Sequence, residues 1–237
     1  IKLAEKKLIP DFIIRQGIKI LLKKRINSLV SNNPEENIQG KIQFIKKMNL
    51  SSIAVVPELA NDQHYEIPAE FYNYCLGKHK KYSSCYWDDK TKNLNEAELL
   101  SLKLTSKHAK LTNGLNILEL GCGWGSLTFW MAKQYPKSKI TAVSNSSSQR
   151  LHILEQAKKR KLKNISVITE DMNTFNPKVR YDRVVSVEMI EHMRNHKKLF
   201  KKIASWLKPD GLFFMHIFVH KSQPYLFEVE ESDDWMS

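Results

Sequence analysis

Amphipathic helices are predicted in the first half of the chain, because apolar residues recur there at a spacing of three to four. The pattern holds in DFIIRQGIKILLKKRINSLV, residues 11–30, and after a turn in NNPEENIQGKIQFIKKM, residues 32–48. A third helix is predicted over residues 94–111, with Asn93 or Asn95 as its N-cap.

From residue 114 onward, short apolar runs alternate with helical segments. Such runs are typical of parallel strands buried on both faces, and the segments between them are typical of crossover helices. The pattern predicts a doubly wound α/β sheet, in which ligands bind at the carboxyl ends of the strands. The expected strands are 115–120, 139–146, 164–171, 181–189 and 212–220, and the expected helices are 127–135, 148–161 and 196–208, with a turn at 209–211.

We expect the chain to divide at about residue 93. Residues 1–93 would form a helical N-terminal cap and lid region, and residues 94–237 a Rossmann-like core. Within the first part, the periodicity is lost over residues 51–93. This segment is rich in Tyr, His and Ser, and we expect it to form a lid or the wall of a site.

Composition narrows the class of protein. Of the 237 residues, 42% are hydrophobic and 10% aromatic, as in a globular chain long enough to bury a core. No apolar run approaches the ~18 residues of a membrane span, and the basic N-terminal residues lack a signal-peptide cleavage site. The 3 cysteines lack metal-ligand spacing. We therefore expect a soluble, cytoplasmic protein without a bound metal.

The formal net charge of +13 raises the question of an anionic partner. Lysines along exposed helix faces explain the charge more simply, and no zinc-finger spacing or RNA-binding aromatic signature is present, so we expect no nucleic-acid partner. Residues 1–26 are strongly basic, with only Glu5 and Asp11 as acids, which leaves peripheral membrane contact open. The pair of N-terminal helices predicted over residues 11–30 and 32–48 also leaves a homodimer open.

The segment LELGCGWGS joins the first predicted strand to its helix. Gly121, Gly123 and Gly125 allow a sharp turn and let a ligand approach the main chain, although such glycines also serve a plain strand–helix turn. Trp124 and the absence of a further glycine disfavour a dinucleotide site, and no Gly-Lys-Ser/Thr ending marks a P-loop. A cofactor without phosphate fits better, and S-adenosylmethionine is one.

Polar residues follow the second and third predicted strands, at what would be the same edge. Asn145 can hydrogen-bond ribose hydroxyls, with Gln149 one helical turn later, although many nucleotide sites carry an acid where Asn145 stands. Asp171 can accept from the amino group of adenine, and Met172 can pack on its ring. Taken singly, Asn145 is equally typical of a turn and Asp171 of a helix cap.

The fourth strand ends in SVEMIEHMRNH, which brings Glu188, Glu191 and His192 to this edge. An amine is mostly protonated at neutral pH, and it must lose a proton before it can attack a methyl group. A histidine, with a pKa of about 6.5, can take that proton, while carboxylates attract the ammonium and orient the imidazole. A helix N-terminus with an acid in its first turn is the simpler interpretation of the Glu-His pair alone. His196 is expected on the surface.

Several motifs, taken in order, resemble the plant coclaurine N-methyltransferases, within the cyclopropane-fatty-acid-synthase-like S-adenosylmethionine-dependent methyltransferases. They are LGKHKKYSSCYW, LELGCGWGSLTFWMAKQYP, AVSNSSSQ, YDRVVSVEMIEHM and DDWM, and the resemblance covers nearly the whole chain. It implies a class I methyltransferase fold and methyl transfer from S-adenosylmethionine to a small-molecule amine. The residues implied are Glu188, Glu191 and His192 in catalysis, with His192 as general base, Tyr82, Ser83 and Val187 at the cofactor, and Tyr65 and Glu66 at the substrate.

Cyclopropane synthases, which modify unsaturated phospholipid acyl chains, share this core and are the alternative. That subgroup has Cys where this chain has Ser84 and Gly where it has Glu188, whereas Glu191 and His216 fit both subgroups. A regulatory protein that had lost the chemistry would lack the Glu-His pair, and a nucleic-acid methyltransferase would carry an Asn-Pro-Pro-aromatic or Pro-Cys element. The identity of the amine does not follow from the sequence.

The resemblance departs from the family at the C-terminus. Related sheets close with an antiparallel hairpin, which we expect to be missing here because the sequence ends soon after the fifth strand. A five-stranded sheet would leave an exposed edge.

Overall fold

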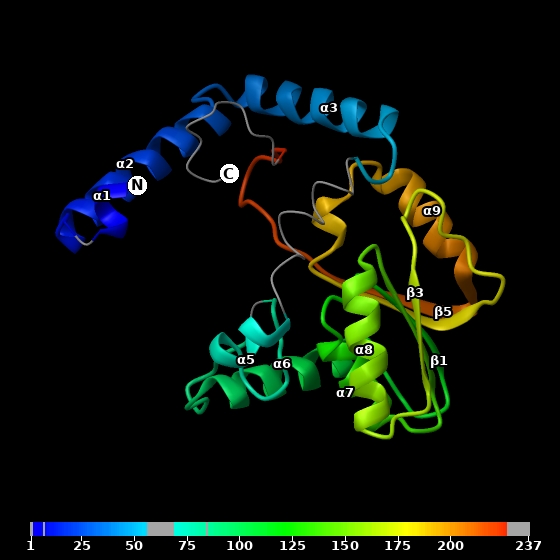
Figure 1. Cartoon of the computed structure of the whole chain (residues 1–237). Helices are drawn as coiled ribbons and strands as arrows, with labels where there is room; N and C mark the ends of the chain where they lie inside the picture. Colours follow the sequence, from blue (N-terminus) through cyan, green and yellow to red (C-terminus); the bar gives the residue numbers. More distant parts are fainter. Residues whose placement is uncertain (1, 7, 56–68, 84, 227–237) are drawn as a thin grey trace. The chain divides into compact units, whose positions relative to one another are not determined.

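The computed structural model describes residues 2–6, 8–55, 69–83 and 85–226. The predicted substrate residues Tyr65 and Glu66, as well as Ser84 and the DDWM motif, lie outside the described residues. The chain forms two compact units, of which one comprises Ile1–Lys47 with Val219–Ser237 and the other Met48–Phe218. Figure 1 shows their elements coloured along the sequence.

The first unit is built on α2 (Asp11–Leu29) and α3 (Pro34–Leu50), preceded by the short α1 (Lys2–Glu5). The two long helices confirm the predictions for this part of the chain. Asn33 starts α3, because its side chain accepts a hydrogen bond from the main-chain N–H of Glu35 at 2.9 Å. Pro34 then takes the first helical position, where a missing N–H costs nothing.

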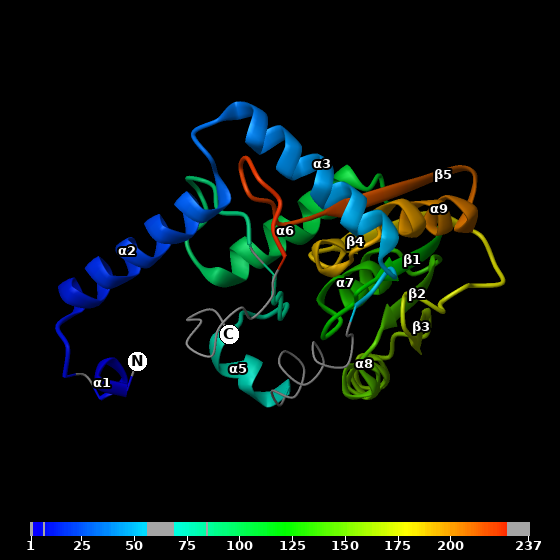
Figure 2. The ribbon, with the colours of Figure 1, turned by 90° about the horizontal axis from the view of Figure 1, so that it is seen from above.

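The second unit contains a five-stranded, all-parallel sheet, which confirms the predicted doubly wound α/β architecture (Figure 2). The strand order is β3-β2-β1-β4-β5, and every neighbouring pair is parallel. The strands are β1 (Asn116–Leu120), β2 (Lys139–Ser144), β3 (Ile165–Thr169), β4 (Tyr181–Val187) and β5 (Leu207–His216).

The beginning of β5 differs from the prediction. We expected a turn at Pro209–Gly211, whereas β5 starts at Leu207, directly after the preceding helix. Its pairing with β4 shifts register between Tyr181 and Arg183, which accommodates the expected turn residues as an irregularity inside the strand. Proline and glycine are tolerated at such irregularities in a strand that pairs on one side.

Helices cover both faces of the sheet. On one face lie α6 (Leu94–His108), α7 (Ser126–Gln134) and α8 (Ser147–Lys159), and on the other lies α9 (His196–Trp206). The core is correspondingly divided: one cluster joins β1 and β4 to Leu199, Ile203 and Trp206 of α9, whereas two others join the opposite face to α6, α7 and α8. Of the two predicted N-caps, Asn93 and Asn95, the structure confirms Asn93. Its side chain accepts a hydrogen bond from the main-chain N–H of Glu96.

The chain between α3 and the sheet is fixed by two asparagines. Asn173 accepts from the main-chain N–H groups of Ile53 and Ala54 at 2.9 and 3.2 Å. Asn195, 1% exposed, donates to the carbonyls of Asn49 and Ser51, both at 2.9 Å. These bonds satisfy main-chain groups outside regular structure, which would otherwise be costly to bury.

Three short elements complete the described chain. They are η1 (Ala69–Phe71) and α5 (Tyr72–Cys75) before α6, and η2 (Ile190–His192) after β4. None of the helices in the described residues is both long and apolar enough to cross a bilayer.

Candidate active site

The candidate site lies at the carboxyl edge of the sheet. Because β1 stands between β2 and β4, the winding reverses between β1 and β4, and ligands bind at such a reversal in open α/β sheets. The residues that follow neighbouring strands are therefore close together: Asp171 after β3, Asn145 after β2, Gly121 after β1 and Glu188 after β4. The sheet thus gathers the residues predicted at the strand ends, and their individual roles stay predictions.

The glycine loop, residues 121–125, connects β1 to α7. Gly121, Gly123 and Gly125 have φ values of 75°, 51° and 85°, which residues with a side chain rarely adopt. A Cβ on Gly121 would lie 2.6 Å from Met189, and one on Gly125 would lie 2.8 Å from Ile153. A Cβ on Gly123 would meet nothing within 4 Å. Gly121 and Gly125 therefore permit close packing, whereas the main chain at Gly123 borders open space that a ligand can approach.

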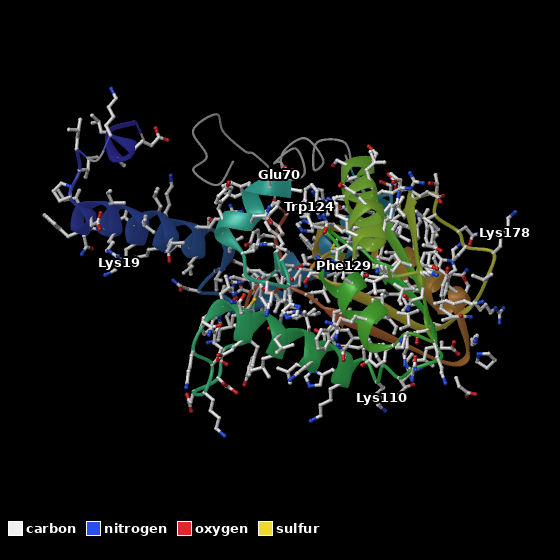
Figure 3. All side chains as sticks on the ribbon, turned by 60° about the horizontal axis from the view of Figure 1, so that its bottom comes forward. Lys19, Glu70, Lys110, Trp124, Phe129 and Lys178 are labelled. Atoms are coloured by element: carbon white, nitrogen blue, oxygen red, sulfur yellow. The ribbon has the colours of Figure 1, made fainter. Side chains whose placement is uncertain are left out.

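Trp124, in the middle of this loop, lies between α5 and α8 (Figure 3). It is buried, and its ring lies 5.6 Å from that of Tyr72 in α5 and 5.3 Å from that of His152 in α8. Burial lowers the pKa of His152, so this imidazole is held toward its neutral form. The bulk of Trp124 thus joins α5 and α8 to the glycine loop.

The two residues predicted at the end of β2 lie in different environments. Asn145 is partly exposed at the strand end. Gln149, by contrast, is 1% exposed, and its Oε1 accepts from the hydroxyl of Ser144 at 2.6 Å. Its Nε2 is buried and has no hydrogen-bond partner among the described residues. The structure therefore keeps Asn145 at the open edge and turns the Gln149 amide inward.

The two residues predicted at the end of β3 also lie in different environments. Asp171, partly exposed, accepts from the N–H of Asn173 and so stabilises a turn. The Met172 side chain is 7% exposed and packs in the core cluster with Phe175 and Trp206. The carboxylate therefore lies at the edge, and the methionine contributes to the core.

Glu188 follows β4 in the left-handed region, with φ at 51°. Its main-chain N–H donates to the carbonyl of His216 at 2.8 Å, and its Oε1 lies 3.9 Å from Nδ1 of the same histidine. Val187, the last residue of β4, pairs with His216 and packs partly buried against the core. A side chain in this conformation is unusual and is found mainly where the surrounding structure enforces it.

The short helix η2 carries the other two catalytic candidates. Glu191 Oε1 accepts from the N–H of Phe218 at 3.0 Å, whereas its Oε2 is buried without a hydrogen-bond partner among the described residues. His192 is exposed, one residue further along the same turn. His196, which we expected on the surface, is half-buried, because its ring contacts the Ile190 carbonyl at 3.0 Å and stacks on Phe200.

A loop that we call the wall loop, residues 77–83, carries the predicted cofactor contacts Tyr82 and Ser83. Tyr82 is exposed, and its ring lies 5.3 Å from that of Tyr72. Lys81 is 6% exposed, and its Nζ donates to the hydroxyl of Ser83 at 2.7 Å. Burial lowers the pKa of Lys81, and the negative charge of Glu188 opposes this. The wall loop therefore lies within electrostatic reach of the end of β4.

Sequence analysis missed Lys81 and Glu98. Glu98 of α6 is fully buried, and its carboxylate accepts from main-chain N–H groups of the wall loop. Its position was visible in the helical pattern, because Glu98 shares a face with Ser101, Leu102 and Thr105, all of which are buried. Lys81 had no such signal, since its burial depends on a loop without periodicity.

Glu119 is a second buried acid, in the middle of β1. It is 3% exposed, and the hydroxyl of Thr128 donates to its Oε2 at 2.6 Å. Burial raises its pKa to about 8, although the Thr128 bond acts in the opposite direction. Glu119 is therefore largely protonated below neutral pH.

The model of the mycolic acid cyclopropane synthetase family matches residues 57–237 of this chain. The chain belongs to this family. Among curated relatives, it is 36% identical to (S)-coclaurine N-methyltransferase from Thalictrum flavum subsp. glaucum, covering 100% of this chain and 66% of that protein. It is 30% identical to cyclopropane-fatty-acyl-phospholipid synthase from Escherichia coli (strain K12), over 67% of this chain and 40% of that protein. This member of the family thus spans 66% of the length of the first of these relatives.

Solved structures confirm the predicted class I S-adenosylmethionine-dependent methyltransferase fold. A coclaurine N-methyltransferase bound to N-methylheliamine and SAH matches with a TM-score of 0.92 and 35% identity, covering 99% of this chain and 68% of that one. The cyclopropane synthase MmaA2 from Mycobacterium tuberculosis matches with a TM-score of 0.61 and 24% identity, covering 70% of this chain and 58% of that one. The second likeness concerns the fold alone.

Proposed function

We propose that this protein transfers a methyl group from S-adenosylmethionine to the nitrogen of a small-molecule amine. The observation that carries the proposal is the pair of carboxylates, Glu188 and Glu191, that flank Met189, which packs against Gly121 of the glycine loop. They occur in a chain 36% identical to a coclaurine N-methyltransferase. A cation-receiving group next to a cofactor loop is what methylation of an amine requires.

The residues at the sheet edge fit the cofactor. Gly123 leaves space against the main chain, and Asn145 and Asp171 offer polar groups to hydroxyl and amino hydrogens. Tyr82 and Ser83 would contact the methionine end. When bound, S-adenosylmethionine supplies an electrophilic methyl group on a positively charged sulfur.

The two carboxylates would receive the amine as its ammonium. Glu191 Oε1 accepts from Phe218 N, whereas its buried Oε2 has no hydrogen-bond partner among the described residues. This unused acceptor would bind an N–H of the substrate once the side chains that cover it move aside. Glu188 would supply a second negative charge from the end of β4. Holding the nitrogen in line with the methyl carbon accounts for a large part of the rate enhancement in such transfers.

His192 would act as the general base. It lies one residue after Glu191, so the same turn that binds the ammonium carries the group that takes its proton. Its exposure lets it pass the proton on to water. The order of events is binding as the cation, loss of one proton to the imidazole, and attack by the neutral nitrogen.

Modification of unsaturated phospholipid acyl chains is the second candidate. The family model's own description and the 30% identity to a bacterial cyclopropane synthase favour it. Glu188 weighs against it, because an alkene carries no cation that a carboxylate could stabilise. The position of this side chain at the edge therefore makes the amine the better candidate.

Methyl-labelled S-adenosylmethionine distinguishes the two candidates. The full protein is incubated in parallel with primary and secondary amines and with vesicles of unsaturated phospholipid, and the labelled product is identified. We expect label on an amine and a loss of ~100-fold or more in kcat for His192→Ala. The control is Glu155→Gln, an exposed carboxylate on α8, which should leave kcat unchanged. Label in acyl chains would overturn the amine assignment.

A further inference from the structure

The wall loop is fixed by side chains of α6 instead of by regular secondary structure. The N–H of Gly77 donates to Glu98 Oε1 at 2.8 Å, and the N–H of His79 donates to Oε2 at 2.7 Å. The N–H of Lys81 also donates to Oε1, at 3.2 Å. Asn95, one turn earlier, accepts from the N–H of Lys78 at 2.7 Å. Four main-chain donors in five residues thus end on two side chains of one helix.

Burial makes these bonds strong and specific. Glu98 is 0% exposed, so its carboxylate has lost water and depends on the three N–H groups that replace it. Gly77 approaches so closely that a Cβ there would lie 2.7 Å from Glu98 Oε2 and 2.9 Å from Asn95 Oδ1. The carboxylate and the loop are therefore fitted to each other from both sides.

The fixed loop contacts α7 and lies within electrostatic range of the end of β4. The ring of His79 lies 5.9 Å from that of Trp130 in α7, directly after the glycine loop. The buried Lys81 holds the Ser83 hydroxyl at 2.7 Å and is within electrostatic range of Glu188. A change at Glu98 is therefore transmitted through the loop backbone to the side chains that would contact the cofactor.

We propose that Glu98 is a positioning residue for the cofactor side of the site. By binding the N–H groups of Gly77, His79 and Lys81, it sets the place of Lys81 and Ser83 at the sheet edge. The inference rests on the proposed function for the identity of the cofactor, and it assigns Glu98 no contact with the reacting atoms.

Glu98→Gln tests this role with little change in shape. The amide keeps one acceptor but turns an NH₂ toward main-chain donors, so the wall loop must shift. We expect the Kd for S-adenosylhomocysteine, measured by calorimetry without amine, to rise about tenfold, and the KM for S-adenosylmethionine to rise in parallel. The kcat at saturating cofactor should change less than about threefold, because the groups at the end of β4 stay in place.

Glu96→Gln is the matched control on the same helix. Glu96 also accepts a main-chain N–H, that of Lys92 at 2.9 Å, but it is exposed and binds a different loop. It should leave both constants unchanged. Gly77→Ala is the second variant, because it disturbs the same contact without removing the carboxylate. It should also raise the Kd for S-adenosylhomocysteine, and it replaces Glu98→Gln as the test if that variant fails to fold.

The outcomes separate the two proposals. A lower melting temperature with unchanged Kd and KM in Glu98→Gln and Gly77→Ala would make Glu98 a merely structural residue and overturn the inference. A parent protein that binds S-adenosylhomocysteine but methylates no amine would overturn the proposed reaction, while the binding comparison would still decide the role of Glu98.

Discussion

Glu188 combines an unfavourable backbone with a side chain at the sheet edge. Its φ of 51° lies in the region that glycine adopts without strain, and three glycines with positive φ stand nearby in the glycine loop. A glutamate with this φ lowers the stability of the fold, whereas a glycine would adopt the same φ without strain. This backbone cost is consistent with the proposal that the Glu188 side chain has a function at the sheet edge.

Glu188→Gly is expected to separate stability from activity. Removing the strain should offset the extra flexibility of glycine, so the free energy of unfolding should stay within about 1 kcal/mol of the parent. The rate of amine methylation should fall at least tenfold, by about 1.4 kcal/mol or more in transition-state stabilisation. Urea unfolding and initial rates measure the two quantities. A variant as active as the parent would contradict the role assigned to this carboxylate.

Glu119, in the core of the sheet, should make the free energy of unfolding depend on pH. Its folded pKa of about 8 lies above the ordinary value of 4.5 because the group is completely buried. The folded state therefore binds the proton more tightly, so this contribution to stability is fully present below about pH 4.5 and is lost as the pH rises through 8. Glu119→Gln should remove it, up to about 5 kcal/mol of pH dependence.

The measurement is urea unfolding at several pH values between 5 and 8. The difference in unfolding free energy between Glu119→Gln and the parent should grow in favour of the variant as the pH rises. A constant difference over this range would mean that folding does not raise the pKa of Glu119.

At the scale of elements, the turn from β1 to α7 serves packing and access at different positions. Gly121 and Gly125 allow Met189 and Ile153 to pack against the backbone, whereas the space beside Gly123 is open. The same turn thus holds the end of β4 against β1 and leaves one main-chain segment uncovered. The mobility that three glycines would give a free loop is limited by these two contacts.

Gly121→Ala should therefore mainly reduce the free energy of unfolding, whereas Gly123→Ala should mainly reduce cofactor binding. Each places a side chain at positive φ, at a cost of about 1 kcal/mol in the free energy of unfolding. Gly121→Ala should cost more than this, because its Cβ would lie 2.6 Å from Met189. Gly123→Ala should instead weaken S-adenosylhomocysteine binding beyond its effect on stability. Calorimetry and thermal melts make the comparison, and unchanged binding in Gly123→Ala would contradict the place of the cofactor.

At the scale of the whole molecule, side chains far along the chain fix the segment that enters the second unit. Asn195, at the start of α9, contributes its oxygen to the N-cap through Lys198 N and its NH₂ to Asn49 and Ser51. One buried side chain thus caps the start of a helix and anchors a segment more than a hundred residues earlier. The division of the chain into a cap of residues 1–93 and a core of residues 94–237 stays a prediction.

Asn195→Asp isolates the second of these roles. The carboxylate keeps the cap but faces two carbonyls without a hydrogen to donate, so we expect a loss of about 2–4 kcal/mol in the free energy of unfolding. Asn173→Asp is the comparison, because it keeps both bonds accepted from Ile53 and Ala54 and loses one donated bond, to the Ala54 carbonyl at 3.0 Å. Asn173 is exposed, so water can replace the lost bond, and the variant should cost less than about 1 kcal/mol. Equal losses in chemical unfolding would contradict the anchoring role.

The sequence by itself determined the order and type of the elements in the sheet and the place of the polar residues after each strand. Period and composition are local, so apolar runs of five or six residues bounded by glycine or polar residues identify strands such as β1 and β4 without knowledge of their neighbours. The parallel arrangement then requires that Gly121, Asn145 and Glu188 share an edge. The turn expected at 209–211 failed because pairing with β4 overrode a local preference.

Only the tertiary structure decided which of these side chains reach the edge and which are buried. Gln149 and Met172 follow strands as Asn145 and Asp171 do, yet helix and core packing turn both inward. Glu98 and Lys81 are brought together because a loop without periodicity folds onto α6. Burial and direction of a side chain depend on contacts between distant segments, and a local pattern holds no information about those contacts.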